Sequence, residues 1–236
     1  MEHLSLTPKI QTKLFYHDTA FLELIKIYKE NKLPNKIILS GKRGIGKSTT
    51  AYHFINYIFS KDEEFKYNLD KFEINNSNKS FNLVKNNSHP NLCSISLQED
   101  KNSIEISQIR EMYNFVNKSS FNNKERVILI DNVEALNNHS SNALLKIIEE
   151  PNEKVIFILI HDSSKKLIET LNSRCLKFNF FLSFDNTIKA TNKILNHNVL
   201  DNINNDLINN YESVGDILNL YKSSIDLKMD LSNMSL

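Results

Sequence analysis

A glycine-rich octapeptide limits what this chain can fold into more than any other feature. Residues 41–48 read GKRGIGKS and fill every fixed position of the pattern G-x-x-x-x-G-K-[ST]. An apolar segment, 37–39, comes before the loop, and helical periodicity begins at about Lys47. Glycine adopts positive φ angles and has no Cβ atom, so backbone N–H groups can turn inward around phosphate oxygens. The stretch therefore predicts a strand, a phosphate-binding loop and a helix whose N-terminus adds further N–H donors.

The motif gives each of its polar side chains a chemical task. The Lys47 ammonium would contact the β- and γ-phosphates of a nucleotide, and the Ser48 hydroxyl would bind Mg²⁺. The rest of the predicted nucleotide-binding set in this segment is Gly41, Gly44, Gly46 and Thr49. Three of the four glycines in the whole chain fall in this window, which favours a binding loop over an ordinary turn.

A second apolar run ends in an aspartate. Residues 127–130 read VILI and predict a buried strand, and Asp131 follows them directly. An aspartate at the end of a strand beside a phosphate loop is where such proteins hold magnesium, directly or through water. The alternative is an aspartate that only caps a turn, and the intact loop upstream makes that the weaker interpretation. We therefore predict that Asp131 joins Ser48 at the magnesium side of a nucleotide site.

Further motifs follow these two in a specific order. NALLKIIEEP (142–151) has helical periodicity, a strand is predicted at 155–160, and TLNSRC occupies 170–175. The set is completed by KLPNKIILSGKRGIGKST at 32–49, HPN at 89–91 and ISQIREM at 106–112. In this order the segments resemble the clamp-loader branch of the AAA+ ATPases, and within it the delta-prime family of bacterial DNA polymerase III. The resemblance covers about residues 8 to 180 and is far more specific than the loop alone.

The expected fold is α/β. Strands alternate with helical segments, which favours a mostly parallel sheet flanked by helices, and the resemblance implies a P-loop AAA+ domain over residues 1–180. A small helical lid domain is expected over 181–228, with Gly215 separating two short helices, and a tail at 229–236. The helical collar that holds the family's ring together has no room before Leu236. The chain is therefore either a fragment or a shortened form that assembles through its first two domains.

The resemblance implies a role in loading the sliding clamp on primed DNA. The expected partners are gamma/tau-type and delta subunits, with the clamp and the primed DNA reached through the complex. Arg174 matches the arginine of the family's Ser-Arg-Cys motif, which reaches into the ATP site of a neighbouring subunit. A guanidinium suits this task because its planar fork and permanent charge can neutralise a γ-phosphate. Only four arginines occur among 29 basic residues, which favours this role over a surface arginine at a strand edge.

One departure from the family bears on catalysis. Active members place a glutamate directly after the strand-terminal aspartate, and this chain has Asn132 there. An amide can hydrogen-bond a water molecule but cannot take its proton. Glu134 is a possible substitute, but it would need an unusual turn to reach the same place. We therefore expect ATP with Mg²⁺ to bind without efficient hydrolysis. The alternative is an active ATPase motor subunit of the gamma type, whereas a small-molecule kinase leaves the Ser-Arg-Cys motif unexplained.

A second departure concerns the groups that contact the γ-phosphate. AAA+ motors usually set a basic lid residue against the phosphates, yet no arginine follows Arg174. Lys189 and Lys193 are the candidates that remain. His161 stands at the predicted end of the 155–160 strand, where a small polar sensor is common. Its side chain could hydrogen-bond the γ-phosphate or face solvent, and the sequence leaves both open.

Metal content and location can also be predicted. Bacterial relatives often carry a four-cysteine zinc module, but the region 60–100 holds only Cys93, with His89 four residues before it, and tetrahedral zinc needs about four ligands. We expect no zinc site. The net charge of +1 provides no strong field toward nucleic acid or membrane. Two cysteines and an N-terminus without a secretion signal indicate a cytoplasmic protein with reduced thiols.

Overall fold

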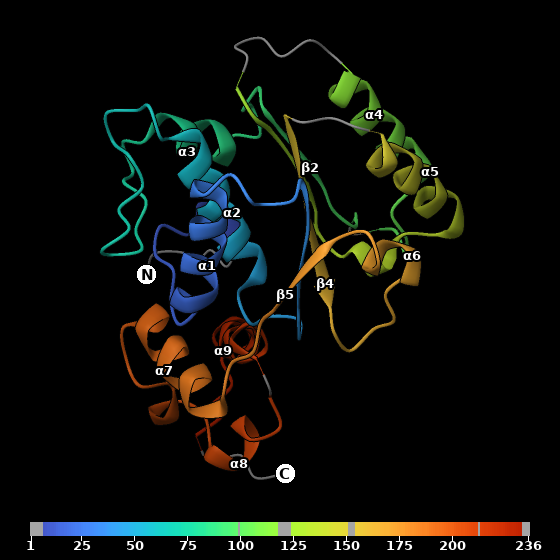
Figure 1. The fold of residues 1–236 in the computed structure, drawn as a ribbon. Helices are drawn as coiled ribbons and strands as arrows, with labels where there is room; N and C mark the ends of the chain where they lie inside the picture. The colour runs from blue at the N-terminus through green and yellow to red at the C-terminus, as the bar shows by residue number, and fades with distance from the viewer. Residues whose placement is uncertain (1–6, 99, 118–123, 151–153, 212, 233–236) are drawn as a thin grey trace.

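The computed structural model describes residues 7–98, 100–117, 124–150, 154–211 and 213–232. Its centre is a five-stranded sheet in the order β2-β3-β4-β1-β5, and every neighbouring pair of strands is parallel (Figure 1). The strands are β1 (Lys36–Gly41), β2 (Leu92–Ile95), β3 (Arg126–Ile130), β4 (Val155–Asp162) and β5 (Leu176–Asn179). The predicted parallel α/β fold is confirmed.

Helices cover both faces of this sheet (Figure 1). One face carries α1 (Asp18–Lys29), α2 (Lys47–Phe59) and α3 (Lys79–Lys85), and the other carries α4 (Ile106–Asn117), α5 (Asn138–Glu149) and α6 (Glu169–Asn172). Side chains alternate along β1, so Ile37 and Leu39 pack on the α2 side while Ile38 packs on the α5 side. Burial on both faces explains why the central strands are almost continuously apolar.

Strand β4 runs two residues farther than the sequence predicts. His161 and Asp162 pair with Ser40 and Gly41, because β1 also continues past Leu39 and offers them partners. The prediction that the strand ends at residue 160 is therefore wrong. Because His161 and Asp162 are both part of the strand, their side chains point to opposite faces, and only one of them can face the phosphate loop.

Residues 61–88, which are rich in asparagine, belong to the folded body of the protein. Tyr67, Ile74 and Phe81 are buried in the same apolar cluster as α1 and α2. Asn78 begins α3 as its N-cap, where its side chain accepts a hydrogen bond from the Phe81 N–H. Among the described residues, no three His, Cys, Asp or Glu side chains are grouped so that they could hold a metal ion.

A group of helices follows the sheet and lies at the end where β1 meets the phosphate loop (Figure 1). It comprises α7 (Phe184–Leu195), a 3-10 turn η3 (Val199–Asp201), α8 (Asn205–Ile208) and α9 (Val214–Leu227). These helices share a small core of their own, formed by Val199, Ile203, Ile208, Ile217 and Leu231. The helices of this group are called the lid helices below.

Gly215 does not separate two helices as predicted. It lies in the first turn of α9, which Ser213 begins as the N-cap, and the interruption lies before it. A glycine there is explained by packing, because a Cβ atom on Gly215 would lie 2.9 Å from the Cα atom of Gly44. The division into domains 1–180 and 181–228 with a tail at 229–236 stays a prediction, and residues 1–6 and 233–236 lie outside the described residues. In the part of the chain that is described, no helix has the length and apolar character needed to cross a bilayer.

Candidate functional site

The phosphate loop joins the end of β1 to the start of α2. Gly44 and Gly46 have φ angles of 80° and 98°, a region that residues with a Cβ atom rarely adopt. A Cβ atom on Gly41 would lie 2.5 Å from the Phe180 carbonyl oxygen, so this glycine allows the loop to pack against the chain that leaves β5. The loop has the backbone conformation that its glycines predicted.

Three predicted side chains meet where this loop enters α2. The Lys47 side chain is buried, and its Nζ donates to the carbonyl oxygens of Gly41 (2.7 Å) and Lys42 (2.5 Å). The Ser48 hydroxyl donates to Asp131 Oδ2 at 2.9 Å. Burial raises the pKa of Asp131, and the hydrogen bond from Ser48 opposes that rise. The pair predicted for the magnesium side is therefore in direct contact.

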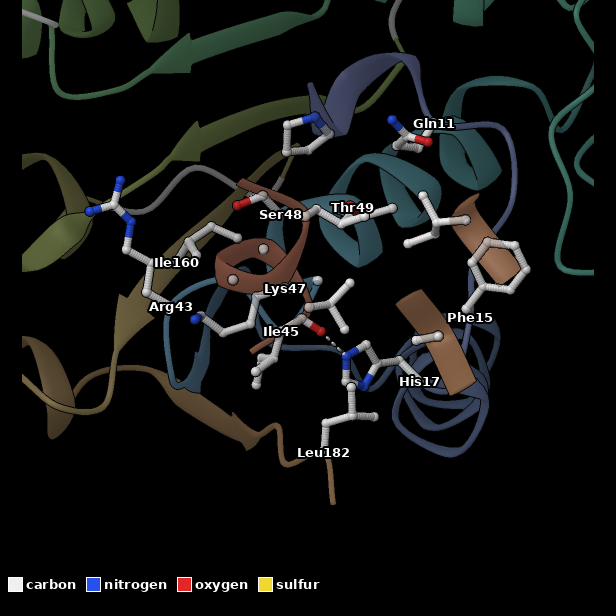
Figure 2. Close-up of a pocket in the computed structure, with 18 of the residues that line it drawn as sticks. Gln11, Phe15, His17, Arg43, Ile45, Lys47, Ser48, Thr49, Ile160 and Leu182 are labelled. Carbon is white, nitrogen blue, oxygen red and sulfur yellow. Dashed lines mark hydrogen bonds between the residues drawn. The ribbon is translucent and has the colours of Figure 1, made fainter. Parts of the chain in front are cut away.

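A cavity of ≈ 390 Å³ opens over the loop (Figure 2). Its volume lies within the range of small-molecule sites, about 300–1,000 Å³. One wall is polar and contains Lys47, Ser48, Thr49 and Asp131. The opposite wall is largely apolar and comes from the N-terminal segment, the residues before α7 and the lid helices, with Pro8, Leu14, Phe15, Leu182, Ile194 and Leu218. A polar cradle beside an apolar wall fits the phosphates and the base of a nucleotide.

The N-terminal segment was missed by sequence reasoning. His17 is buried, stacks edge-on against Phe180, and its Nε2 donates to the Ile45 carbonyl oxygen within the loop (Figure 2). Burial lowers the pKa of His17, so the neutral imidazole is favoured. The segment before α1 therefore both lines the cavity and holds the loop. It has no periodicity or motif that could have announced this role.

Asn132 lines the cavity directly after Asp131. Its backbone is left-handed, with φ 60° and ψ 54°, a conformation that asparagine tolerates better than most residues. Glu134 lies in the short turn η2 (Val133–Ala135), where its Oε2 accepts the Asp162 N–H at 3.1 Å. Glu134 is thus engaged at the end of β4, and it is absent from the described residues that line the cavity.

His161 is buried, which corrects both of its predicted alternatives. Its Nδ1 lies 2.9 Å from Ser40 Oγ and its Nε2 lies 3.1 Å from the Lys165 carbonyl oxygen. Burial lowers its pKa. Because side chains alternate along a strand, the next residue, Asp162, is the one that lines the cavity. The polar residue of β4 that faces the loop is therefore an acid, and it was not predicted because the expected strand ended two residues before it.

The lid helices contact the loop through backbone. The Gly215 N–H donates to the Gly44 carbonyl oxygen at 2.9 Å, and the Ser213 side chain lies against Gly44. Lys193 Nζ lies 4.7 Å from the centroid of the Tyr16 ring, a cation–π contact. Neither Lys193 nor Lys189 is among the described residues lining the cavity. The lid side of the cavity thus carries Asp216 and Asn219 as its polar side chains.

The close contact between Gly44 and Gly215 leads to a prediction about the free energy of unfolding. Alanine at position 215 raises helix propensity by about 1 kcal/mol, but its Cβ atom would press on Gly44. We expect Gly215→Ala to lower the free energy of unfolding by about 1–3 kcal/mol, measured by denaturant titration. The control is Ser223→Ala on the exposed face of α9, where only propensity changes. A stabilised Gly215→Ala protein would show that α9 does not press on the loop.

Arg174 lies apart from this cavity, between α6 and β5. Its Nη2 forms an ion pair with Glu149 Oε1 at 2.8 Å, and its Nη1 donates to the Thr170 carbonyl oxygen at 3.1 Å. The side chain is 40% exposed. Burial raises the pKa of the neighbouring Cys175 thiol to about 11, so this cysteine stays protonated and unreactive at neutral pH. The predicted site residues therefore form two groups, one around the loop and one at the surface.

Comparison with known proteins shows the family of this chain. A family model described as "DNA polymerase III, delta subunit" matches residues 16–182. The chain belongs to the DNA polymerase III delta-subunit family. Within the family it is delta-prime-like. It is 27% identical over 140 residues to subunit delta' of Pseudomonas aeruginosa, covering 59% of this chain and 41% of that protein.

Other relatives of this delta-prime-like chain are also subunits of DNA polymerase III. Subunit delta' of a Buchnera aphidicola strain is 27% identical over 188 residues, 78% of this chain and 54% of that protein. Subunit gamma of the same strain is 28% identical over 209 residues, 86% of this chain and 55% of that protein. The chain spans about half the length of the curated relatives it matches.

The predicted AAA+ fold is confirmed by a solved structure. The RuvB Holliday junction branch migration motor of Thermotoga maritima aligns with a TM-score of 0.53 at 14% identity. The alignment covers 96% of this chain and 70% of the motor. At that identity the likeness concerns the fold alone.

Proposed function

We propose that this chain is a clamp-loader subunit that binds ATP with Mg²⁺ but does not hydrolyse it efficiently. It presents Arg174 to the ATP site of a neighbouring subunit and helps to load the sliding clamp on primed DNA in the cytoplasm. Gamma/tau-type and delta subunits are its direct partners. The observation that carries the proposal is a complete phosphate loop, with Ser48 in contact with Asp131, followed by Asn132 in place of a carboxylate.

The residues present fit a nucleotide with magnesium. Backbone N–H groups of the loop and the Lys47 ammonium would hold the phosphates, with Gly41, Gly44 and Gly46 allowing the backbone to approach them. Ser48 and Asp131 would hold Mg²⁺, which neutralises phosphate charge when bound, and Thr49 lines the same cavity. The apolar wall would accommodate the base. No zinc is part of the proposal.

The absence of efficient turnover rests on Asn132. Hydrolysis needs a group that orients the attacking water and takes its proton, and an amide can do only the first. Glu134 is already engaged with the Asp162 N–H and does not offer a replacement. The competing function, an ATPase motor of the gamma type, requires a carboxylate in this place.

Replacing Asn132 tests this assignment. We expect Asn132→Glu to raise ATP hydrolysis by the isolated chain by about 10²-fold, the lower end of what a general base contributes, because glutamate is strained in the left-handed region. Single-turnover hydrolysis of labelled ATP measures the rate. Asn132→Gln is the control, since it has the same length without the charge and should stay at the wild-type rate. Equal rates for the two variants would remove Asn132 as the cause of the missing turnover.

Reconstitution tests the role in the assembly. The full chain is mixed with gamma/tau-type and delta subunits of its own organism, and loading of labelled clamp on primed DNA is measured with and without it. We expect loading to require this chain. Failure to co-purify with these subunits would contradict the proposal, whatever nucleotide the chain binds.

A further inference from the structure

The carboxyl ends of β1 and β4 place an aspartate beside the start of the phosphate loop. Asp162 is the register partner of Gly41, and the next N–H along, that of Ser163, donates to the Gly41 carbonyl oxygen at 3.0 Å. Lys47 Nζ donates to the same carbonyl oxygen. Asp162 and the Lys47 ammonium are therefore neighbours on one wall of the cavity.

Asp162 is held in place and charged. Its Oδ1 accepts hydrogen bonds from the Ser164 N–H (3.0 Å) and the Ser164 hydroxyl (2.8 Å). Burial opposes ionisation, but these hydrogen bonds and the charge of Lys47 outweigh it and keep the pKa of Asp162 below its usual value. The carboxylate can neither rotate freely away from the loop nor become neutral near pH 7.

Carboxylates are the charged neighbours of Lys47, although Lys13 and Arg43 also line the cavity. The Lys47 ammonium faces the carboxylates of Asp162, Asp131 and Glu134. Across the cavity the lid contributes a further acid, Asp216, whose Oδ2 accepts the Ser213 hydroxyl at 2.7 Å, and no lysine or arginine of the described lid helices lines the cavity. A magnesium ion at Ser48 and Asp131 would offset two of these charges.

This arrangement of charges favours the β-phosphate of a nucleotide over its γ-phosphate. The loop's N–H groups serve a β-phosphate, whereas a γ-phosphate brings additional negative charge to the Lys47 end of the cavity. Like charges repel strongly in a cavity that water only partly screens. From Asp162 at this position we infer that the site holds a nucleoside diphosphate in preference to a triphosphate. The inference rests on the proposed function, because it specifies which nucleotide the same loop retains.

Calorimetric titration of the full chain with Mg²⁺ tests the preference, with ADP and the β,γ-imido analogue of ATP as probes. We expect wild type to bind ADP at least about tenfold more tightly than the analogue. Asp162→Asn, which keeps the size and removes the charge, should narrow that ratio at least about fivefold by strengthening the analogue, with ADP changed less than about twofold. The control is Asp70→Asn, the same substitution at an exposed position outside the cavity, and it should change neither affinity.

Two kinds of failure are distinguishable. If ADP binds but the analogue binds as tightly, or if Asp162→Asn shifts both nucleotides equally, the selectivity is overturned while the nucleotide site stands. If neither nucleotide binds to wild type, the nucleotide site of the proposed function is overturned and the selectivity with it. A change in the ratio caused by Asp70→Asn would trace the effect to overall charge and would also overturn the role of Asp162.

Discussion

Replacing Arg174 by alanine is expected to lower the ATPase rate of the assembled clamp loader by about 10³-fold or more, the range measured when arginine fingers are removed. Arg174 lies outside its own chain's cavity and is 40% exposed, so its charge is available to another subunit. Its ion pair with Glu149 is exposed on both sides and contributes little to folding. The variant should therefore fold normally and bind nucleotide as wild type does. Steady-state hydrolysis by the reconstituted complex is the measurement.

Two further variants separate charge from geometry at this position. Arg174→Lys keeps the charge but loses the planar fork, so it should recover only a small part of the rate. Glu149→Gln releases the guanidinium from its ion pair and leaves Arg174 intact, so the complex should stay active. A complex with Arg174→Ala that hydrolyses ATP at the wild-type rate would rule out the finger role.

Replacing Lys47 by alanine should weaken binding of either nucleotide by about 10²-fold, since charge-assisted hydrogen bonds contribute about 1.5–3 kcal/mol. Lys47 is the first residue of α2, and its ammonium interacts electrostatically with Asp162, Asp131 and Glu134. Without it the phosphates would meet the carboxylates of Asp131 and Asp162, which line the cavity, with no ammonium beside them. Titration with a fluorescent nucleotide measures the affinity.

Lys189→Ala is the matched control for this variant. It removes the same side chain from an exposed position on α7, outside the cavity. We expect less than about a twofold change in affinity, because an exposed charge at a distance is screened by salt. Equal losses in the two variants would point to net charge and away from a phosphate contact by Lys47.

The local elements were predictable because their signals are short-range. The loop between an apolar run and a periodic segment predicted β1, its turn and α2, and Asn137 as the N-cap of α5 follows the same local rule. Strand alternation with helices was enough to predict a parallel sheet. The contact of Ser48 with Asp131 also follows, since Ser48 lies in the first turn of the helix that follows β1 and Asp131 lies at the carboxyl end of β3, and these ends meet at the same edge of the sheet.

The residues that line the cavity were less predictable, because their positions depend on packing between segments distant in sequence. His17 reaches the loop from a segment with no pattern, and Asp162 faces the cavity only because β4 extends along β1 by two residues. Gly215 was predicted to separate two helices, but its role is to let α9 pack closely against Gly44, which is distant in sequence. In each case the missing information was a partner far along the chain.

The central claim is that this chain binds nucleotide without cleaving it, and one measurement on the isolated wild-type chain tests it most directly. The chain is mixed with labelled ATP at saturating concentration and Mg²⁺, and bound and hydrolysed nucleotide are quantified in the same sample. We predict saturable binding, with the ATP recovered intact. Repeated turnover that Lys47→Ala abolishes would contradict the account and identify an ATPase motor of the gamma type.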